Sequence, residues 1–139
     1  MEEMAANHHN PCTVLRLGNV AGADAILGGW RAGFTLDQLP DGRTPARSYI
    51  GPGKLARVLH ALSMADTVPG LLNIAAPGTV EMGDLLDAAH LDWTARPATD
   101  QTIAQVHLDT TTLERLVPFA PTDSTAEGIV RDMKNEVRT

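Results

Sequence analysis

The segment at residues 12–20 restricts the possible folds of this chain more than any other part of the sequence. It follows the Asn10-Pro11 breaker and is apolar on both of its alternating faces. A strand with two apolar faces is typical of a parallel sheet that helices cover on both sides. Residues 1–9 have helical character, so the opening predicts the end of a helix that leads into a central strand.

The later sequence alternates between helical and extended patterns, which favours an α/β layered domain. Gly51-Pro52-Gly53 opens an amphipathic helix, residues 71–75 predict a short buried strand, and the Pro77-Gly78 turn leads into a second amphipathic helix. The residues expected to face the core are Leu55, Val58, Leu59 and Leu62 in the first helix and Met82, Leu85, Leu86 and Ala89 in the second.

The other segments carry weaker signals. Residues 22–53 are rich in Gly, Pro and Asp and predict loops with a short helix at 25–30 and a short strand at 34–39. Two pairs near the end have capping-box spacing, Thr111 with Glu114 and Ser124 with Glu127. Tyr49 is expected to pack under the helix that follows it. The last helix is expected to bury Ile129, Val130, Met133 and Val137.

Composition bounds the size and the partners of the protein. With 139 residues, 43% of them hydrophobic, the chain can bury one modest core, so we expect one domain or part of one. The net charge of −6 argues against a nucleic acid or an anionic membrane as partner, because both require a positive surface. A small molecule fits better. No apolar run is long enough to cross a bilayer and the only cysteine, Cys12, is expected in the core, so we expect a cytoplasmic protein.

Three segments, in order, resemble one enzyme family. Residues 15–22, Leu-Arg-Leu-Gly-Asn-Val-Ala-Gly, are similar to a strand that ends in Asn. Residues 41–50 resemble an Asp-Gly-x-x-x-Arg-Asp-Tyr/Phe-Ile segment. Residues 72–75 with the Pro77-Gly78 turn, followed by Leu108-Asp109-Thr110, resemble a third pair of family segments. Together they resemble the extended short-chain dehydrogenase/reductase family, which contains nucleotide-sugar epimerases and dehydratases.

The resemblance implies a fold and an activity. The fold is α/β, the C-terminal part of a Rossmann-like enzyme without its N-terminal dinucleotide-binding strands. Residues 1–22 would end the Rossmann-type domain, and residues 23–139 would form the substrate-binding part. The parent protein would be an NAD- or NADP-dependent epimerase, dehydratase or reductase, and this half would not bind the cofactor alone.

The resemblance also assigns site residues. The backbone of Leu17 and Gly18, with Asn19, would face the nicotinamide, and the Asn19 side chain would reach the substrate. Arg47 matches the family arginine that contacts the substrate diphosphate, and a planar guanidinium suits phosphate oxygens. Among the apolar residues, Phe34 and Trp30 are candidates for a substrate pocket, although core packing is the commoner role of such residues. His8 and His9 are adjacent but have no Cys, Asp or Glu at the spacing of a metal ligand, and the other three histidines are dispersed along the chain. No metal site is therefore expected.

The departures from the family are as informative as the matches. The sequence has no Gly-x-x-Gly-x-x-Gly turn to hold a pyrophosphate, and no Tyr-x-x-x-Lys, since Gly53 stands four residues after the only tyrosine, Tyr49. No catalytic residue is therefore assigned. We expect a fragment whose partner is the missing N-terminal half or a second copy. The alternative is a self-standing, non-catalytic binding or regulatory module. A third departure is that the usual acidic helix start is replaced by Gly51-Pro52-Gly53-Lys54.

Overall fold

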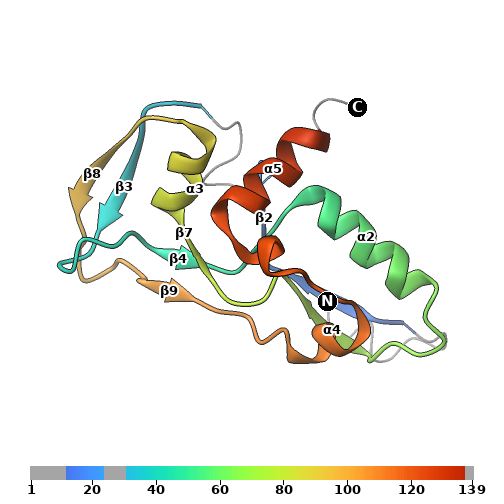
Figure 1. Ribbon diagram of the computed structural model, residues 1–139. Coiled ribbons are helices and arrows are strands. Elements are labelled where there is room, and N and C mark those ends of the chain that lie inside the picture. The colour runs from blue at the N-terminus through green and yellow to red at the C-terminus, as the bar shows by residue number, and fades with distance from the viewer. Residues whose placement is uncertain (1–11, 24–30, 137–139) are drawn as a thin grey trace.

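The computed structural model describes residues 12–23 and 31–136. The strands are β1 (Val14–Leu17), β2 (Asn19–Val20), β3 (Phe34–Gln38), β4 (Ala46–Arg47), β5 (Tyr49–Ile50), β6 (Leu71–Ile74), β7 (Val80–Glu81), β8 (Trp93–Pro97) and β9 (Gln105–Val106). The helices are α2 (Pro52–Ser63), α3 (Met82–Ala89), α4 (Thr111–Leu116), the 3-10 turn η1 (Pro121–Ser124) and α5 (Ala126–Glu136), as Figure 1 shows. The helices predicted at 1–9 and 25–30, with His8, His9, Trp30 and Val137, lie outside the described residues.

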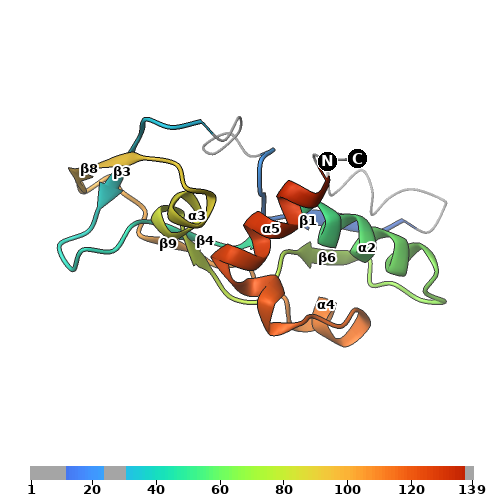
Figure 2. The ribbon, with the colours of Figure 1, turned by 45° about the horizontal axis from the view of Figure 1, so that its top comes forward.

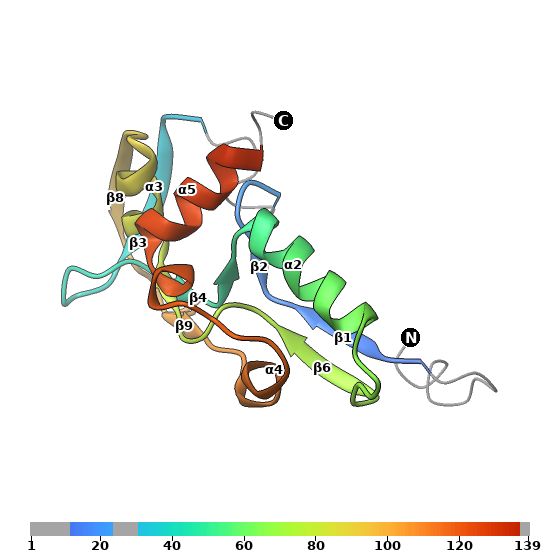
Figure 3. The same cartoon turned by 45° about the vertical axis from the view of Figure 1, so that its right-hand side comes forward.

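Short strands form several small sheets instead of one continuous sheet. Within the described residues β1 pairs with β6, β2 with β5 and β3 with β8, all in parallel. The strand β4 lies between β7, which is antiparallel to it, and β9, which is parallel to it. Figure 3 shows β1 and β6 on the opposite side of the molecule from β3 and β8. The α/β class predicted from the sequence is confirmed.

The strand predicted at residues 12–20 differs from the prediction in two ways. It is interrupted at Gly18, whose amide bonds to the Ile74 carbonyl at 2.9 Å, while the next amide, of Asn19, bonds to the Ser48 carbonyl at 2.9 Å. A Cβ on Gly18 would lie 2.7 Å from that Ser48 oxygen, so the change of partner requires glycine.

Burial on both faces of this strand is also wrong for the described residues. The Leu15 and Leu17 side chains are 36% and 53% exposed, and Cys12 is exposed as well. Leu15 and Leu17 are two positions apart and so point to the same face of β1, and the described residues leave that face partly uncovered. In the same part of the chain β1 has a strand neighbour on one edge alone, β6.

One core cluster lies between β6 and its two helices. Figure 2 shows α2 on one side of β6 and α4 on the other. The buried side chains that fill the cluster are Ile50, Val58, Leu62, Leu72, Ile74, Leu113 and Val117. Leu59 was predicted to belong to this face of α2, but its side chain is 42% exposed. Of the four α2 residues that were predicted to face the core, Val58 and Leu62 are the two that are buried.

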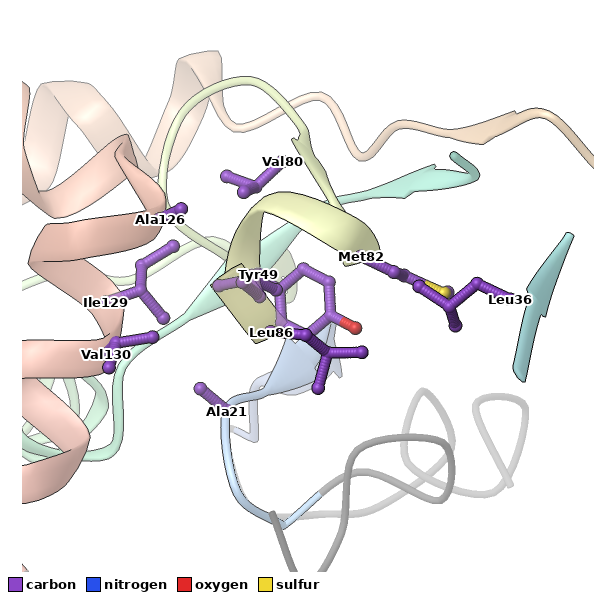
Figure 4. Close-up of a cluster of buried hydrophobic side chains, with 10 residues drawn as sticks. Ala21, Leu36, Tyr49, Val80, Met82, Leu86, Ala126, Ile129 and Val130 are labelled. Carbon is purple, nitrogen blue, oxygen red and sulfur yellow. The ribbon is translucent and has the colours of Figure 1, made fainter. Parts of the chain in front are cut away.

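A second core cluster lies between α3 and α5. Figure 4 shows the Tyr49 ring among side chains from α3, α5 and the neighbouring strands. The buried members are Ala21, Leu36, Tyr49, Val80, Met82, Leu85, Leu86, Ala126, Ile129 and Val130. Tyr49 was predicted to pack under α2, but the alternation along β5 places Tyr49 in this cluster and sends Ile50 toward α2.

The start of α2 explains how the chain manages without an acidic helix start. Gly51 is the N-cap residue and gives no side-chain cap. The carboxylate comes instead from Asp132 of α5, which accepts the Lys54 amide at 2.8 Å and the Arg57 guanidinium at 3.0 Å. A Cβ on Gly51 would collide with the Asp132 carboxylate, so the glycine makes room for a cap that comes from another helix.

The Lys54 side chain ties the same helix end to the segment before α5. Its ammonium group donates to the Pro118 carbonyl at 2.7 Å, forms an ion pair with Asp123 at 2.9 Å and lies 4.4 Å from the centre of the Phe119 ring. Burial raises the pKa of the Asp123 carboxyl, but the bonds from Lys54 and from the Ala120 amide outweigh it and hold that pKa below its ordinary value.

Both predicted capping boxes are one residue out of place. At α4 the Thr110 hydroxyl donates to Glu114 at 2.7 Å and the Asp109 carboxylate accepts the Thr111 amide at 2.9 Å. At α5 the Thr125 hydroxyl accepts the Gly128 amide at 3.1 Å, because η1 takes up Ser124. Ile129, Val130 and Met133 are buried as predicted.

Replacing Asp132 with alanine should destabilise the protein. The Lys54 amide and the Arg57 side chain would lose their acceptor, so we expect the free energy of unfolding to fall by about 1–2 kcal/mol. Urea unfolding followed by circular dichroism measures it. The control is Asp66→Ala, which removes an exposed carboxylate elsewhere. Equal unfolding midpoints for the two variants would contradict the capping role of Asp132.

Candidate functional site

Two of the sequence-predicted polar residues meet where β2 reaches β5. Asn19 begins β2 and pairs in register with Tyr49, while its amide bonds to the carbonyl of Ser48. Arg47 ends β4 and directly precedes Ser48. We call Asn19, Arg47 and Ser48 the β2–β4–β5 junction. Residues that are far apart in the sequence are therefore brought together by one backbone hydrogen bond.

The junction lies at the carboxyl ends of the parallel strands β1 and β6. Leu17 ends β1, Gly18 follows it and Asn19 comes next. Open α/β sheets bind their ligands at this end of their strands. Leu17, Gly18 and Asn19 thus lie at the end of a strand, as the sequence predicted. The Leu17 side chain there is half-exposed.

The side chains of Arg47 and Asn19 both have hydrogen-bonding groups without a partner among the described residues. The Arg47 guanidinium donates through Nη1 to the Ala46 carbonyl at 2.7 Å, and within the described residues it has no carboxylate partner. Both residues are half-buried. The Asn19 side chain has no hydrogen-bond partner among residues 12–23 and 31–136. A guanidinium and an amide held this way can bind an anionic or hydroxyl-bearing ligand.

Phe34 is not part of the junction. It begins β3, pairs with Trp93 of β8 and packs partly buried against the cluster between α3 and α5. Figures 2 and 3 both show β3 far from β1. Leu17, Gly18, Asn19 and Arg47 therefore lie near one another, and Phe34 belongs to another sheet.

The fold itself is known from solved enzyme structures. The chain is similar to an NAD-dependent NDP-hexosamine 5,6-dehydratase involved in tunicamycin biosynthesis, with 16% identity and a TM-score of 0.68 over 99% of this chain and 50% of that one. It is similar to the UDP-glucuronic acid 4-epimerase of Bacillus cereus, with 15% identity and a TM-score of 0.61 over 94% of this chain and 48% of that one. It is also similar to the UDP-glucose 4-epimerase of Thermotoga maritima, with 17% identity and a TM-score of 0.60 over 98% of this chain and 50% of that one.

The chain has the fold of the NAD-dependent epimerases and dehydratases. It spans about half the length of the solved structures that it matches. No protein-family model matches it, and no curated protein matches it. The α/β class and the family resemblance read from the sequence are both confirmed at the level of this epimerase fold.

The part of the chain that the structure describes contains no helix that is long and apolar enough to span a membrane. In the same residues no group of three or more His, Cys, Asp or Glu side chains is placed to hold a metal ion.

The described residues also form an acidic cleft, whose lining includes Ala46, next to Arg47 of the junction. It has a volume of about 900 Å³, and four of its lining residues are Glu81, Asp84, Asp87 and Glu127. None of Leu17, Gly18, Asn19, Phe34 and Arg47 lines it. This cleft was not predicted from the sequence, although Glu81, Asp84 and Asp87 are three residues apart, a helical spacing that places them near one another.

The environment of Asp84 in the acidic cleft disfavours the ionised form of its carboxyl. Burial raises the pKa of its carboxyl above the ordinary value, and the negative charges of Glu81, Asp87 and Glu127 raise it further. A carboxyl whose pKa is raised by folding destabilises the folded state once it is ionised. Its ionisation therefore lowers stability as the pH rises through that pKa.

Replacing Asp84 with asparagine should stabilise the protein near neutral pH and have no effect in acid. Below the unfolded-state pKa, near 4, both residues are neutral and the two proteins should unfold alike. Above the raised pKa the variant should be more stable, by no more than about 0.5 kcal/mol because the carboxyl is largely open to solvent.

Urea unfolding at a series of pH values measures the difference. The control is Asp100→Asn, a change at an exposed residue outside the cleft. A stability gain that is the same at every pH would contradict the repulsion.

Proposed function

We propose that this chain is the substrate-binding half of an NAD(P)-dependent epimerase- or dehydratase-type oxidoreductase, and that it is not active alone. The observation that carries the proposal is that 99% of the chain matches 50% of an NAD-dependent dehydratase. The order of the three family-like segments makes it the C-terminal half. The substrate is a small molecule. A nucleotide sugar is favoured because two of the similar structures are named as complexes with UDP-glucuronic acid and with UDP-glucose.

The free edge of β1 supports the proposal. The Val14 amide bonds to the Gly70 carbonyl at 2.8 Å and the Gly18 amide to the Ile74 carbonyl at 2.9 Å. Since alternate amides of a strand point to opposite edges, the Leu15 and Leu17 amides point away from β6. The described residues supply no strand on that side. An unpaired edge is one with which a further strand would pair, and the exposed Leu15 and Leu17 side chains on one face of β1 are ones that a further element would bury.

In this proposal the residues of the junction bind and orient the substrate. Arg47 binds the phosphate groups and Asn19 binds a substrate hydroxyl. Tyr49 takes no part in catalysis, because its side chain is 1% exposed within the α3 and α5 core. The catalytic tyrosine and lysine belong to the other half of the enzyme.

The cofactor would contact this chain only at the end of β1. When bound, NAD or NADP supplies a hydride acceptor for the carbon that bears the substrate hydroxyl. The exposed side chain of Leu17 offers an apolar surface that fits the flat nicotinamide end of such a molecule. The sequence has no glycine-rich turn for the pyrophosphate, so most of the dinucleotide site belongs to the other half.

A second candidate function is a self-standing, non-catalytic binding or regulatory module with the same fold. The missing Tyr-x-x-x-Lys favours it. The two proposals differ in what happens at β1, because a self-standing module must remain monomeric although that edge is open.

Sedimentation of the 139-residue chain distinguishes the two. The half-enzyme proposal predicts concentration-dependent association through β1, which Leu17→Lys should reduce because a charged side chain disfavours pairing at an edge. Leu59→Lys is the control, since Leu59 is 42% exposed on α2 and Leu17 is 53% exposed on β1. A wild-type chain that stays monomeric at all concentrations would contradict the half-enzyme proposal and favour the module.

Nucleotide binding is the direct test of the substrate role. We expect UDP to perturb the Asn19 and Arg47 resonances in an NMR titration. Arg47→Ala should weaken binding by about tenfold, because a charge-assisted bond to phosphate is lost. Arg131→Ala, at an exposed position of α5, should leave the affinity unchanged. No response of the wild-type chain to UDP would overturn the nucleotide-sugar assignment.

A further inference from the structure

Ser48 is the most highly connected residue of the junction. Its side chain is buried, with 3% of the residue exposed. The hydroxyl donates to the Gly78 carbonyl at 3.1 Å and accepts the Leu108 amide at 2.9 Å. Its backbone amide donates to the Val106 carbonyl at 3.1 Å and its carbonyl accepts the Asn19 amide at 2.9 Å.

These bonds join segments that are distant in the sequence. The Gly78 turn follows β6, Val106 ends β9 and Leu108 lies before α4. Val106 is also the register partner of Arg47 in the β4 and β9 pair. The Ser48 hydroxyl therefore binds the segment that follows β9, and β9 is the strand that pairs with Arg47. The Ser48 carbonyl binds the amide of Asn19.

The hydroxyl is chemically suited to this place. One oxygen donates to a carbonyl and accepts from an amide at the same time, which neither alanine nor an ionised aspartate can do.

Packing leaves Ser48 little freedom to move without its neighbours. Tyr49 is fixed in the core on one side of it. The Ser48 carbonyl is so close to Gly18 that a Cβ there would lie 2.7 Å from it. A displacement of Ser48 must therefore displace Gly18 and Asn19, or Arg47, or both.

We propose that Ser48 is a positioning residue, whose hydroxyl sets the distance and orientation between Asn19 and Arg47. The inference rests on the proposed function, because it makes Ser48 a determinant of substrate binding at the same junction. Ser48 itself does not contact the substrate.

The test compares Ser48→Ala and Ser48→Thr in the full chain, with UDP as the probe. Ser48→Ala should weaken UDP binding by about tenfold and speed exchange of the Asn19 amide proton, whereas Ser48→Thr should restore both to within about threefold of wild type. The control is Ser63→Ala, which removes a hydroxyl that donates to the His60 carbonyl at the end of α2.

A purely structural role would lower the unfolding midpoint of Ser48→Ala without changing the affinity of the folded protein, and that result would overturn the inference. Should Ser48→Ala not fold, Ser48→Cys replaces it, since a thiol of similar size bonds more weakly. Unchanged affinity in Ser48→Cys would equally overturn the inference.

The failure of the proposed function gives a different pattern. If the wild-type chain does not bind UDP, the NMR signals of the Asn19 amide and the Arg47 guanidinium still report the geometry. Shifts in Ser48→Ala that Ser48→Thr reverses would support the positioning role without a nucleotide ligand. Signals identical to wild type would overturn it.

Discussion

The burial of β5 is the constraint on which the rest of the structure depends. Tyr49 and Ile50 are consecutive, 1% and 0% exposed, and face different core clusters. Two fully buried neighbours on a strand require cover on both faces. The helices α3 and α5 cover one side and α2 with β6 covers the other, so the whole molecule is built around this short strand.

The candidate site follows from the same constraint. Because β5 is fixed from both sides, Ser48 at its start is fixed too, and through it Asn19 and Arg47. In the part of the chain that the structure describes, the β1 edge opposite β6 has no strand partner, and β1 leads directly into this rigid centre. The described residues thus combine a well-packed interior with a two-stranded sheet of β1 and β6.

Local patterns predicted α2, α3, α5 and β6 but not β8 or β9, and contacts between distant segments accounted for other errors. The helix after Gly51 and its buried Val58 and Leu62 could be read from periodicity, because a helix repeats every few residues. The Asp132 cap could not, since 78 residues separate it from Lys54. The break at Gly18 depends on how close the Ser48 carbonyl comes, which no spacing reveals.

The site was predicted in the same uneven way. Asn19 and Arg47 were found by resemblance, whereas Ser48 was missed because its importance lies in four hydrogen bonds to separate segments. The acidic cleft was missed because Glu127 joins Glu81, Asp84 and Asp87 only in the folded chain.

Amide hydrogen exchange along β1 in the isolated chain tests the central claim most directly. The account predicts an alternating pattern, with slow exchange at Val14, Arg16 and Gly18, whose amides face β6, and fast exchange at Leu15 and Leu17. At concentrations low enough for the chain to be monomeric, slow exchange at all five amides would contradict the claim that β1 has an uncovered edge.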